Sequence, residues 1–126
     1  MKQKILLIDD EKDFCFFLKK NLESKAELEV TFCHSGEEGI RLAEELRPDL
    51  ILLDIIMPGM DGSEVAAQLK SSSLASNIPV VFLTAVLTGK ESEERDRFIG
   101  GWHYIGKPVD TNKLIDLINK LTSSQK

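Results

Sequence analysis

The sequence predicts an α/β fold, in which a parallel β-sheet is covered by helices on both faces. Short apolar runs alternate with longer amphipathic stretches along the 126 residues, and an alternation repeated five times is typical of strands joined by crossover helices. Several of the runs are apolar throughout, as in strands buried on both faces of a parallel sheet. Right-handed crossovers then leave few ways to wind the sheet.

Each element is expected from its own local pattern. The short apolar runs that we expect to be strands are Ile5–Ile8, Leu28–Cys33, Leu50–Leu53, Val80–Thr84 and Trp102–Ile105. Apolar residues at helical spacing follow them, in four sets: Phe14, Phe17, Leu18 and Leu22; Ile40, Ala43 and Leu46; Val65, Ala66 and Leu69; and Leu114, Leu117, Ile118 and Leu121. Capping patterns mark three helix starts, at Ser35 with Glu38, Asp61 with Glu64, and Asp110. A further helix is expected within the very polar stretch Leu87–Phe98.

Composition and charge exclude several classes of protein. The length indicates one domain with a sizeable core, and 42% hydrophobic and 29% charged residues are ordinary for a globular protein. A formal net charge of -5 argues against a general nucleic-acid or anionic membrane surface. No apolar stretch is long enough to cross a membrane, and because the first expected strand begins almost at once, we expect no signal peptide. Cys15 and Cys33 fit no zinc or redox spacing, so we expect buried reduced thiols in a cytoplasmic protein.

Polar and charged residues collect where the expected strands end. Asp9 and Asp10 follow the first strand, Asp54 the third, Thr84 closes the fourth, and Lys107 follows the fifth. In open parallel sheets, ligands bind outside the carboxyl ends of the strands. Three carboxylates so close together need a compensating cation beyond one lysine. A hard divalent ion such as Mg²⁺, which prefers oxygen ligands and often binds a phosphate as well, is therefore expected.

Each of these residues also has a simpler interpretation. Asp9 and Asp10 could cap the following helix and add charge to its first turn, and Asp54 could cap the turn after its strand. Thr84 could be an ordinary strand residue, and Lys107 a solvated surface lysine. Only their combination at successive strand ends favours a binding site.

Four motifs in this order resemble those of a response-regulator receiver domain. They are ILLIDDEKDF, PDLILLDIIMPGMDG, VVFLTA and YIGKP, and the resemblance extends from Lys4 to about Leu121. It implies a flavodoxin-like, doubly wound five-stranded parallel sheet of order 2-1-3-4-5, flanked by five helices. The receiver domain is expected over residues 1–122, and residues 123–126 are expected to form a flexible tail or the start of a linker.

The same resemblance implies a role for each residue of the site. Asp54 would accept a phosphoryl group from a phosphohistidine and form an aspartyl phosphate. Asp10 would bind Mg²⁺ directly and Asp9 through water, with Asp54 and the backbone carbonyl of Ile56 as further ligands.

On the phosphoryl group itself, Lys107 and the Thr84 hydroxyl would bind oxygens, assisted by the Ala85 amide. Tyr104 would be a switch aromatic that turns inward when Thr84 moves. The Lys107–Pro108 peptide bond is expected to be cis, and the two histidines, His34 and His103, are expected to be surface residues.

The implied function is that of a phosphorylation-controlled switch. Its partners would be a sensor histidine kinase or a histidine phosphotransfer protein, and a phosphorylation-dependent homodimer is left open. The domain would catalyse only its own phosphorylation and dephosphorylation, would bind neither nucleic acid nor membrane, and would act on the surface of the fourth helix, fifth strand and fifth helix.

Three other classes of protein are alternatives to this function. A magnesium-dependent phosphatase would need an acid two residues after its nucleophile, where this chain has Ile56. A flavodoxin-like electron carrier would need a phosphate-binding loop where Asp9, Asp10 and Glu11 stand. A receiver that no longer switches and serves as a docking module is the third alternative.

Overall fold

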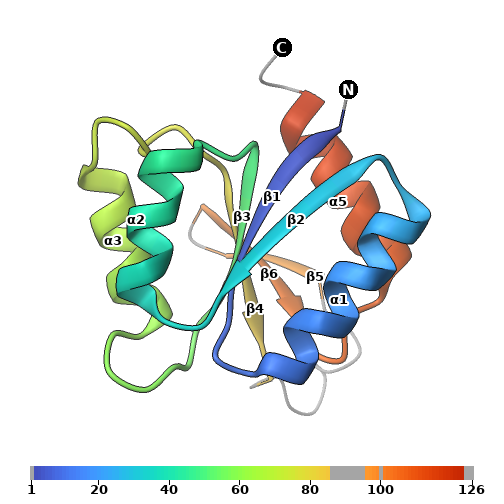
Figure 1. The fold of residues 1–126 in the computed structure, drawn as a ribbon, viewed down its shortest axis with the longest axis horizontal. Helices are drawn as coiled ribbons and strands as arrows, with labels where there is room; N and C mark the ends of the chain where they lie inside the picture. Colours follow the sequence, from blue (N-terminus) through green and yellow to red (C-terminus); the bar gives the residue numbers. More distant parts are fainter. Residues whose placement is uncertain (1, 86–95, 100, 124–126) are drawn as a thin grey trace.

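The computed structural model describes residues 2–85, 96–99 and 101–123. They form one central β-sheet with helices packed on both of its faces (Figure 1). Helices α2 and α3 lie together on one side of the sheet, and α1 and α5 lie on the other. The predicted α/β architecture is therefore confirmed.

The sheet contains the five expected strands in the expected order. The parallel strands are β1 (Gln3–Ile8), β2 (Leu28–Cys33), β3 (Leu50–Asp54), β4 (Val80–Thr84) and β6 (Trp102–Gly106). They are arranged as β2-β1-β3-β4-β6, which is the order 2-1-3-4-5 when these five strands alone are counted. The central strands β3 and β4 are buried along their whole length, in agreement with their apolar composition.

One strand was not expected. Strand β5 (Asp96–Ile99) pairs antiparallel with β6 and forms the edge of the sheet. The prediction of a helix within Leu87–Phe98 is therefore wrong for the last residues of that stretch, from Asp96 on. Pairing with the open edge of β6 outweighs a weak local helical pattern, and Gly101, with a φ of 85°, permits the sharp approach to β6. The part of that expected helix before Asp96 lies outside the described residues.

The described part of the chain contains four helices, and each begins or ends close to its predicted position. They are α1 (Lys12–Lys25), α2 (Gly36–Leu46), α3 (Gly62–Ser71) and α5 (Thr111–Ser123). The predicted caps are confirmed, because Ser35, Asp61 and Asp110 each accept a hydrogen bond from a backbone N–H of the first helical turn. Helix α5 includes Ser123, which was expected to belong to the tail.

Two apolar cores hold the helices to the sheet. Cys15, Leu18 and Leu22 anchor α1 in the core that it shares with α5, whereas Cys33 lies in the core beneath α2 and α3. Burial raises the pKa of Cys15 to about 12, and both cysteines are free and buried, as predicted. None of the described helices is long and apolar enough to cross a membrane.

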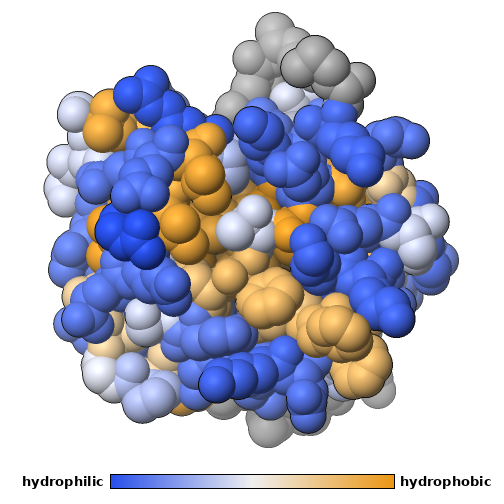
Figure 2. Space-filling model, in the orientation of Figure 1, coloured by the Kyte–Doolittle hydropathy of each residue, from blue (hydrophilic) through white to orange (hydrophobic). Residues whose placement is uncertain are grey.

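Phe17 was predicted to lie on the buried face of α1, and Leu46 on that of α2. Both predictions are wrong. Phe17 is 61% exposed and Leu46 is 43% exposed. Apolar side chains reach the surface over the first turns of α1 and along the line between α2 and β2 (Figure 2). In α1 the small Cys15 occupies the position against the sheet, so the buried stripe lies to one side of Phe17.

Candidate functional site

The carboxyl ends of the central strands lie level with one another. In the strand register, Asp54 pairs with Leu83 and Thr84 pairs with Gly106, while Asp9 directly follows β1. Helix α3 closes in behind this edge, because a Cβ atom on Gly62 would lie 2.4 Å from the Asp54 carbonyl oxygen. The fold therefore brings the predicted strand-end residues into one place.

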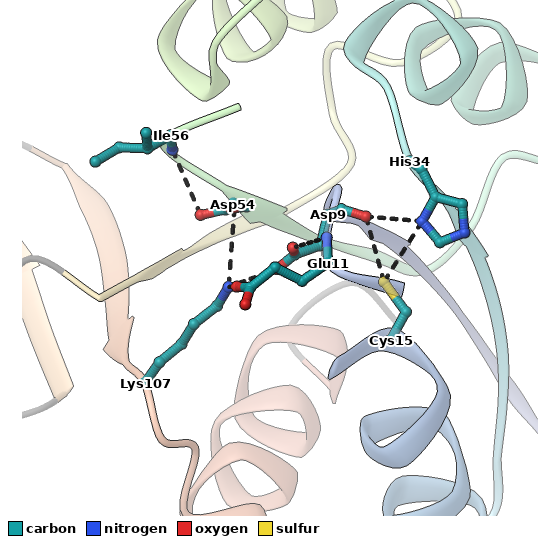
Figure 3. A network of polar contacts seen from close by, with 7 residues as sticks. All are labelled: Asp9, Glu11, Cys15, His34, Asp54, Ile56 and Lys107. Atoms are coloured by element: carbon teal, nitrogen blue, oxygen red, sulfur yellow. Dashed lines mark hydrogen bonds and ion pairs between the residues drawn. The ribbon is translucent and has the colours of Figure 1, made fainter. Parts of the chain in front are cut away.

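Lys107 is the centre of an ion-pair network (Figure 3). Its Nζ lies 2.8 Å from Asp9 Oδ2, 2.7 Å from Glu11 Oε1 and 3.8 Å from Asp54 Oδ2. The ammonium also lies 4.2 Å from the centre of the Phe14 ring. One cation thus faces three carboxylates that come from two different strand ends.

The two strand-end aspartates are buried. Asp9 is 0% exposed and Asp54 is 6% exposed, and each is held by an amide two residues further on. Glu11 N–H donates to Asp9 Oδ1 at 2.9 Å, and Ile56 N–H donates to Asp54 Oδ1 at 3.4 Å. A pocket of about 280 Å³ opens in front of them, lined by Asp10, Glu11, Asp54, Ile56, Ala85 and Lys107.

Burial and crowding shift the protonation equilibria at this site. Burial, followed by the charge of Asp9, raises the pKa of Asp54 to about 6. Burial alone would lower the pKa of Lys107, but hydrogen bonds to Asp9 and Glu11 and the nearby carboxylate charges outweigh it and raise that pKa. Lys107 is therefore charged at neutral pH, and it only partly offsets the repulsion felt by Asp54.

The donor set fits a hard divalent cation. Asp9, Glu11 and Asp54 each place an oxygen within 4.8 Å of the others. Three carboxylates against one ammonium leave two negative charges uncompensated. Apart from the Lys107 ion pair, Asp9 Oδ2 is a buried oxygen without a hydrogen-bond partner among the described residues. Oxygen ligands with this excess charge are consistent with a Mg²⁺ site.

Glu11 is the acid of this cluster to which the sequence assigned no role. Its position directly after two aspartates was the available signal, but only the fold turns its carboxylate toward Lys107. Asp10 and Ile56 line the pocket without belonging to that close cluster, so their roles as ligands stay predictions.

The other predicted residues also lie around the pocket or beside it. Thr84 is 5% exposed at the end of β4, and its carbonyl accepts a hydrogen bond from the Lys107 N–H at 2.8 Å. Ala85 is exposed and lines the pocket. Tyr104 is half-buried and stacks on Phe82 with 5.2 Å between the ring centres. The Lys107–Pro108 peptide bond is cis, as expected.

The fold and the site together define an α/β domain with an acidic pocket at the carboxyl ends of its parallel strands. The family model of the response regulator receiver domain matches residues 5–119. The chain therefore belongs to the response regulator receiver domain family, which acts in two-component signalling, and its pocket of Asp9, Glu11 and Asp54 is typical of a phosphoacceptor site. This membership decides against the phosphatase and the electron carrier.

Individual relatives agree with this assignment. The chain is 32% identical to Protein PilH of Pseudomonas aeruginosa over 120 residues, which cover 92% of this chain and 94% of PilH. It is 39% identical over 100 residues to the alkaline phosphatase synthesis transcriptional regulatory protein PhoP of Bacillus subtilis, covering 79% of this chain but 38% of that longer protein. Among solved structures, the receiver domain of the Francisella response regulator 1452 matches with a TM-score of 0.82 and 28% identity, over 99% of this chain and 100% of that one.

Proposed function

We propose that this domain accepts a phosphoryl group on Asp54 in a Mg²⁺-dependent reaction and thereby controls a partner or an output domain. The observation that carries the proposal is the position of the buried Asp54 carboxylate, which faces the pocket with the Lys107 ammonium 3.8 Å away. The phosphodonor would be a phosphohistidine on a sensor histidine kinase or a histidine phosphotransfer protein.

In the proposed transfer, one bond forms and one breaks. An oxygen of the Asp54 carboxylate forms a bond to phosphorus, the P–N bond to the donor histidine breaks, and its electron pair returns to the imidazole nitrogen. The chain's own contribution is to position these groups and to neutralise charge on the phosphoryl oxygens. Lys107, the Thr84 hydroxyl and the Ala85 amide would bind those oxygens.

Asp9, Asp10, Asp54 and the Ile56 carbonyl would hold the Mg²⁺ ion, and Glu11 lies close enough to assist them. The bound ion would neutralise the carboxylates and the incoming phosphoryl group. The domain would thus catalyse only its own phosphorylation and dephosphorylation.

The switch that follows would run from Thr84 to Tyr104. Their strands are neighbours, and the ring of Phe82, two residues before Thr84, stacks on the Tyr104 ring. A Thr84 side chain drawn toward the phosphoryl group would change the packing of that ring, and so the surface made by β6 and α5. A receiver that docks without switching is the alternative, and it would be phosphorylated without a change around Tyr104.

Mass spectrometry after incubation with acetyl phosphate tests the site directly. We expect one added phosphoryl group that requires Mg²⁺ and is released by hydroxylamine, and Asp54→Asn should abolish it. Asp61→Asn is the matched control, because Asp61 caps α3 outside the pocket and should leave the reaction intact. Modification of the Asp54→Asn variant at the wild-type rate would contradict the assignment.

A further inference from the structure

Every polar group of Asp9 has a partner in another residue of the chain. Its N–H donates to the Cys33 carbonyl at 3.1 Å, and its carboxylate binds Glu11 and Lys107. Its carbonyl oxygen is approached from the opposite side by His34 Nδ1 at 2.9 Å and by the Cys15 thiol at 3.3 Å (Figure 3). The cluster of contacts therefore fixes the peptide unit that joins Asp9 to Asp10.

The need for these side-chain donors follows from where β2 ends. Strand β2 pairs with β1 as far as Cys33, and one further ladder bond links Asp9 N–H to Cys33. Beyond that point the chain turns into α2, so no strand amide lies opposite the Asp9 carbonyl. His34, the first residue after β2, places its ring there instead, and the ring also packs on Phe32 with 5.4 Å between centroids. The buried carbonyl is thereby satisfied by two side chains, the His34 ring and the Cys15 thiol.

We infer that His34 is a positioning residue of the phosphorylation site: its Nδ1–H group holds the Asp9 carbonyl and so sets the orientation of the acidic pair at the end of β1 for Mg²⁺. The inference rests on the proposed function. Outer partners of metal ligands fix the ligands in place before the ion arrives, and losing one typically costs about tenfold or more in affinity.

The contact also determines the state of the ring. A carbonyl oxygen only accepts hydrogen bonds, so the proton must be on Nδ1. In the neutral ring this leaves Nε2 without a proton, and the tautomer is set by the hydrogen bond that His34 makes. Nitrogen-15 chemical shifts of His34 at alkaline pH should therefore report the Nδ1–H tautomer, and an Nε2–H tautomer would overturn the inference.

Three substitutions separate hydrogen bonding from packing. His34→Phe keeps a ring beside Phe32 but has no N–H group. In His34→Asn the side-chain amide nitrogen lies near the former Nδ1, whereas in His34→Gln it lies near the former Nε2. We expect His34→Phe and His34→Gln to raise the Mg²⁺ dissociation constant by about tenfold, measured by isothermal titration calorimetry, and His34→Asn to restore it to within about threefold of wild type.

Phosphorylation by acetyl phosphate gives a second readout. The Mg²⁺ concentration for half-maximal rate should rise in His34→Phe, while the rate at saturating Mg²⁺ changes by less than about twofold, because the bound ion itself then holds the acids in place. His103→Asn is the control, since His103 lies on β6 opposite Val81, away from the strand ends that form the pocket. It should change neither value.

The outcomes distinguish a failure of the proposed function from a failure of the role of His34. If wild type neither binds Mg²⁺ nor is phosphorylated on Asp54, the proposed function fails, and the role of His34 fails with it. If wild type behaves as proposed but all three His34 variants bind Mg²⁺ like wild type, only the inference about His34 is wrong. Equal weakening in His34→Asn and His34→Phe would also overturn it, because a loss of packing would then explain the effect.

Discussion

Helices α1 and α3 both follow a central strand with an aspartate at or directly after its end, yet their acidic residues are used differently. At α3, Asp61 and Glu64 form a capping box, in which each side chain accepts a hydrogen bond from the other residue's N–H. At α1, Glu11 occupies the N-cap position without a side-chain cap, and its carboxylate turns to Lys107 instead. The acids of α3 stabilise a helix, whereas those of α1 face a pocket.

This difference shows that acidic residues near a helix start need not serve that helix. The capping acids lower the free energy of the fold, because each satisfies a free backbone amide. The pocket acids are crowded and two of them, Asp9 and Asp54, are buried. Burial, followed by the charge of Asp9, raises the pKa of Asp54. Removing the capping acid Asp61 should therefore lower stability, whereas neutralising the buried Asp54 should raise it.

The largest effect is expected when the shared cation is removed. Lys107→Met leaves Asp9 and Asp54 buried with no ammonium beside them, and we expect the free energy of unfolding to fall by about 3 kcal/mol. Urea unfolding monitored by circular dichroism measures this. Lys113→Met, on an exposed position of α5, should change it by less than about 0.5 kcal/mol. If both variants are equally stable, Lys107 does not hold the acids together.

A smaller effect of opposite sign is expected at Asp54. Folding raises the pKa of this carboxyl from 3.8 to about 6, so its ionised form destabilises the protein above about pH 6, and the penalty disappears below about pH 4. Asp54→Asn should then be more stable than wild type by about 2 kcal/mol at about pH 8, without Mg²⁺, and by almost nothing at about pH 4.

Thermal unfolding of the two proteins in parallel across this pH range checks the sign. Added Mg²⁺ should narrow the difference, because it stabilises wild type by binding the native state. An Asp54→Asn variant that is less stable than wild type at about pH 8 would contradict the cost expected from burying this carboxylate beside Asp9.

The smallest effects are expected from substitutions at the N-cap positions of α3 and α1. Asp61→Ala removes a working N-cap and should cost about 1 kcal/mol. Glu11→Ala removes no cap, and its exposed ion pair contributes little, so it should change stability by less than about 0.5 kcal/mol. Chemical denaturation of both variants measures the two values. Equal losses would mean that Glu11 stabilises α1 after all.

Much of the fold could be predicted from sequence because its signals are local. Strand burial, helical spacing and the caps at Ser35 and Asp61 depend on residues a few positions apart, and these were confirmed. Phe17 was wrongly predicted to be buried. The spacing of apolar residues indicates which side of a helix is apolar, but not how wide the buried part of that side is. Strand β5 was missed because its stretch of the sequence is very polar and shows no strand pattern, although it pairs with the neighbouring strand β6, where Ile99 and Trp102 are partners.

The sequence by itself determined that acids, a threonine and a lysine stand at successive strand ends, and its motifs determined the family. Only the tertiary structure decided which of them meet. Glu11 and Lys107 are 96 positions apart, and His34 and Asp9 are 25 positions apart. Such pairings depend on how strands align and where each one ends, and no local preference of the chain contains that information.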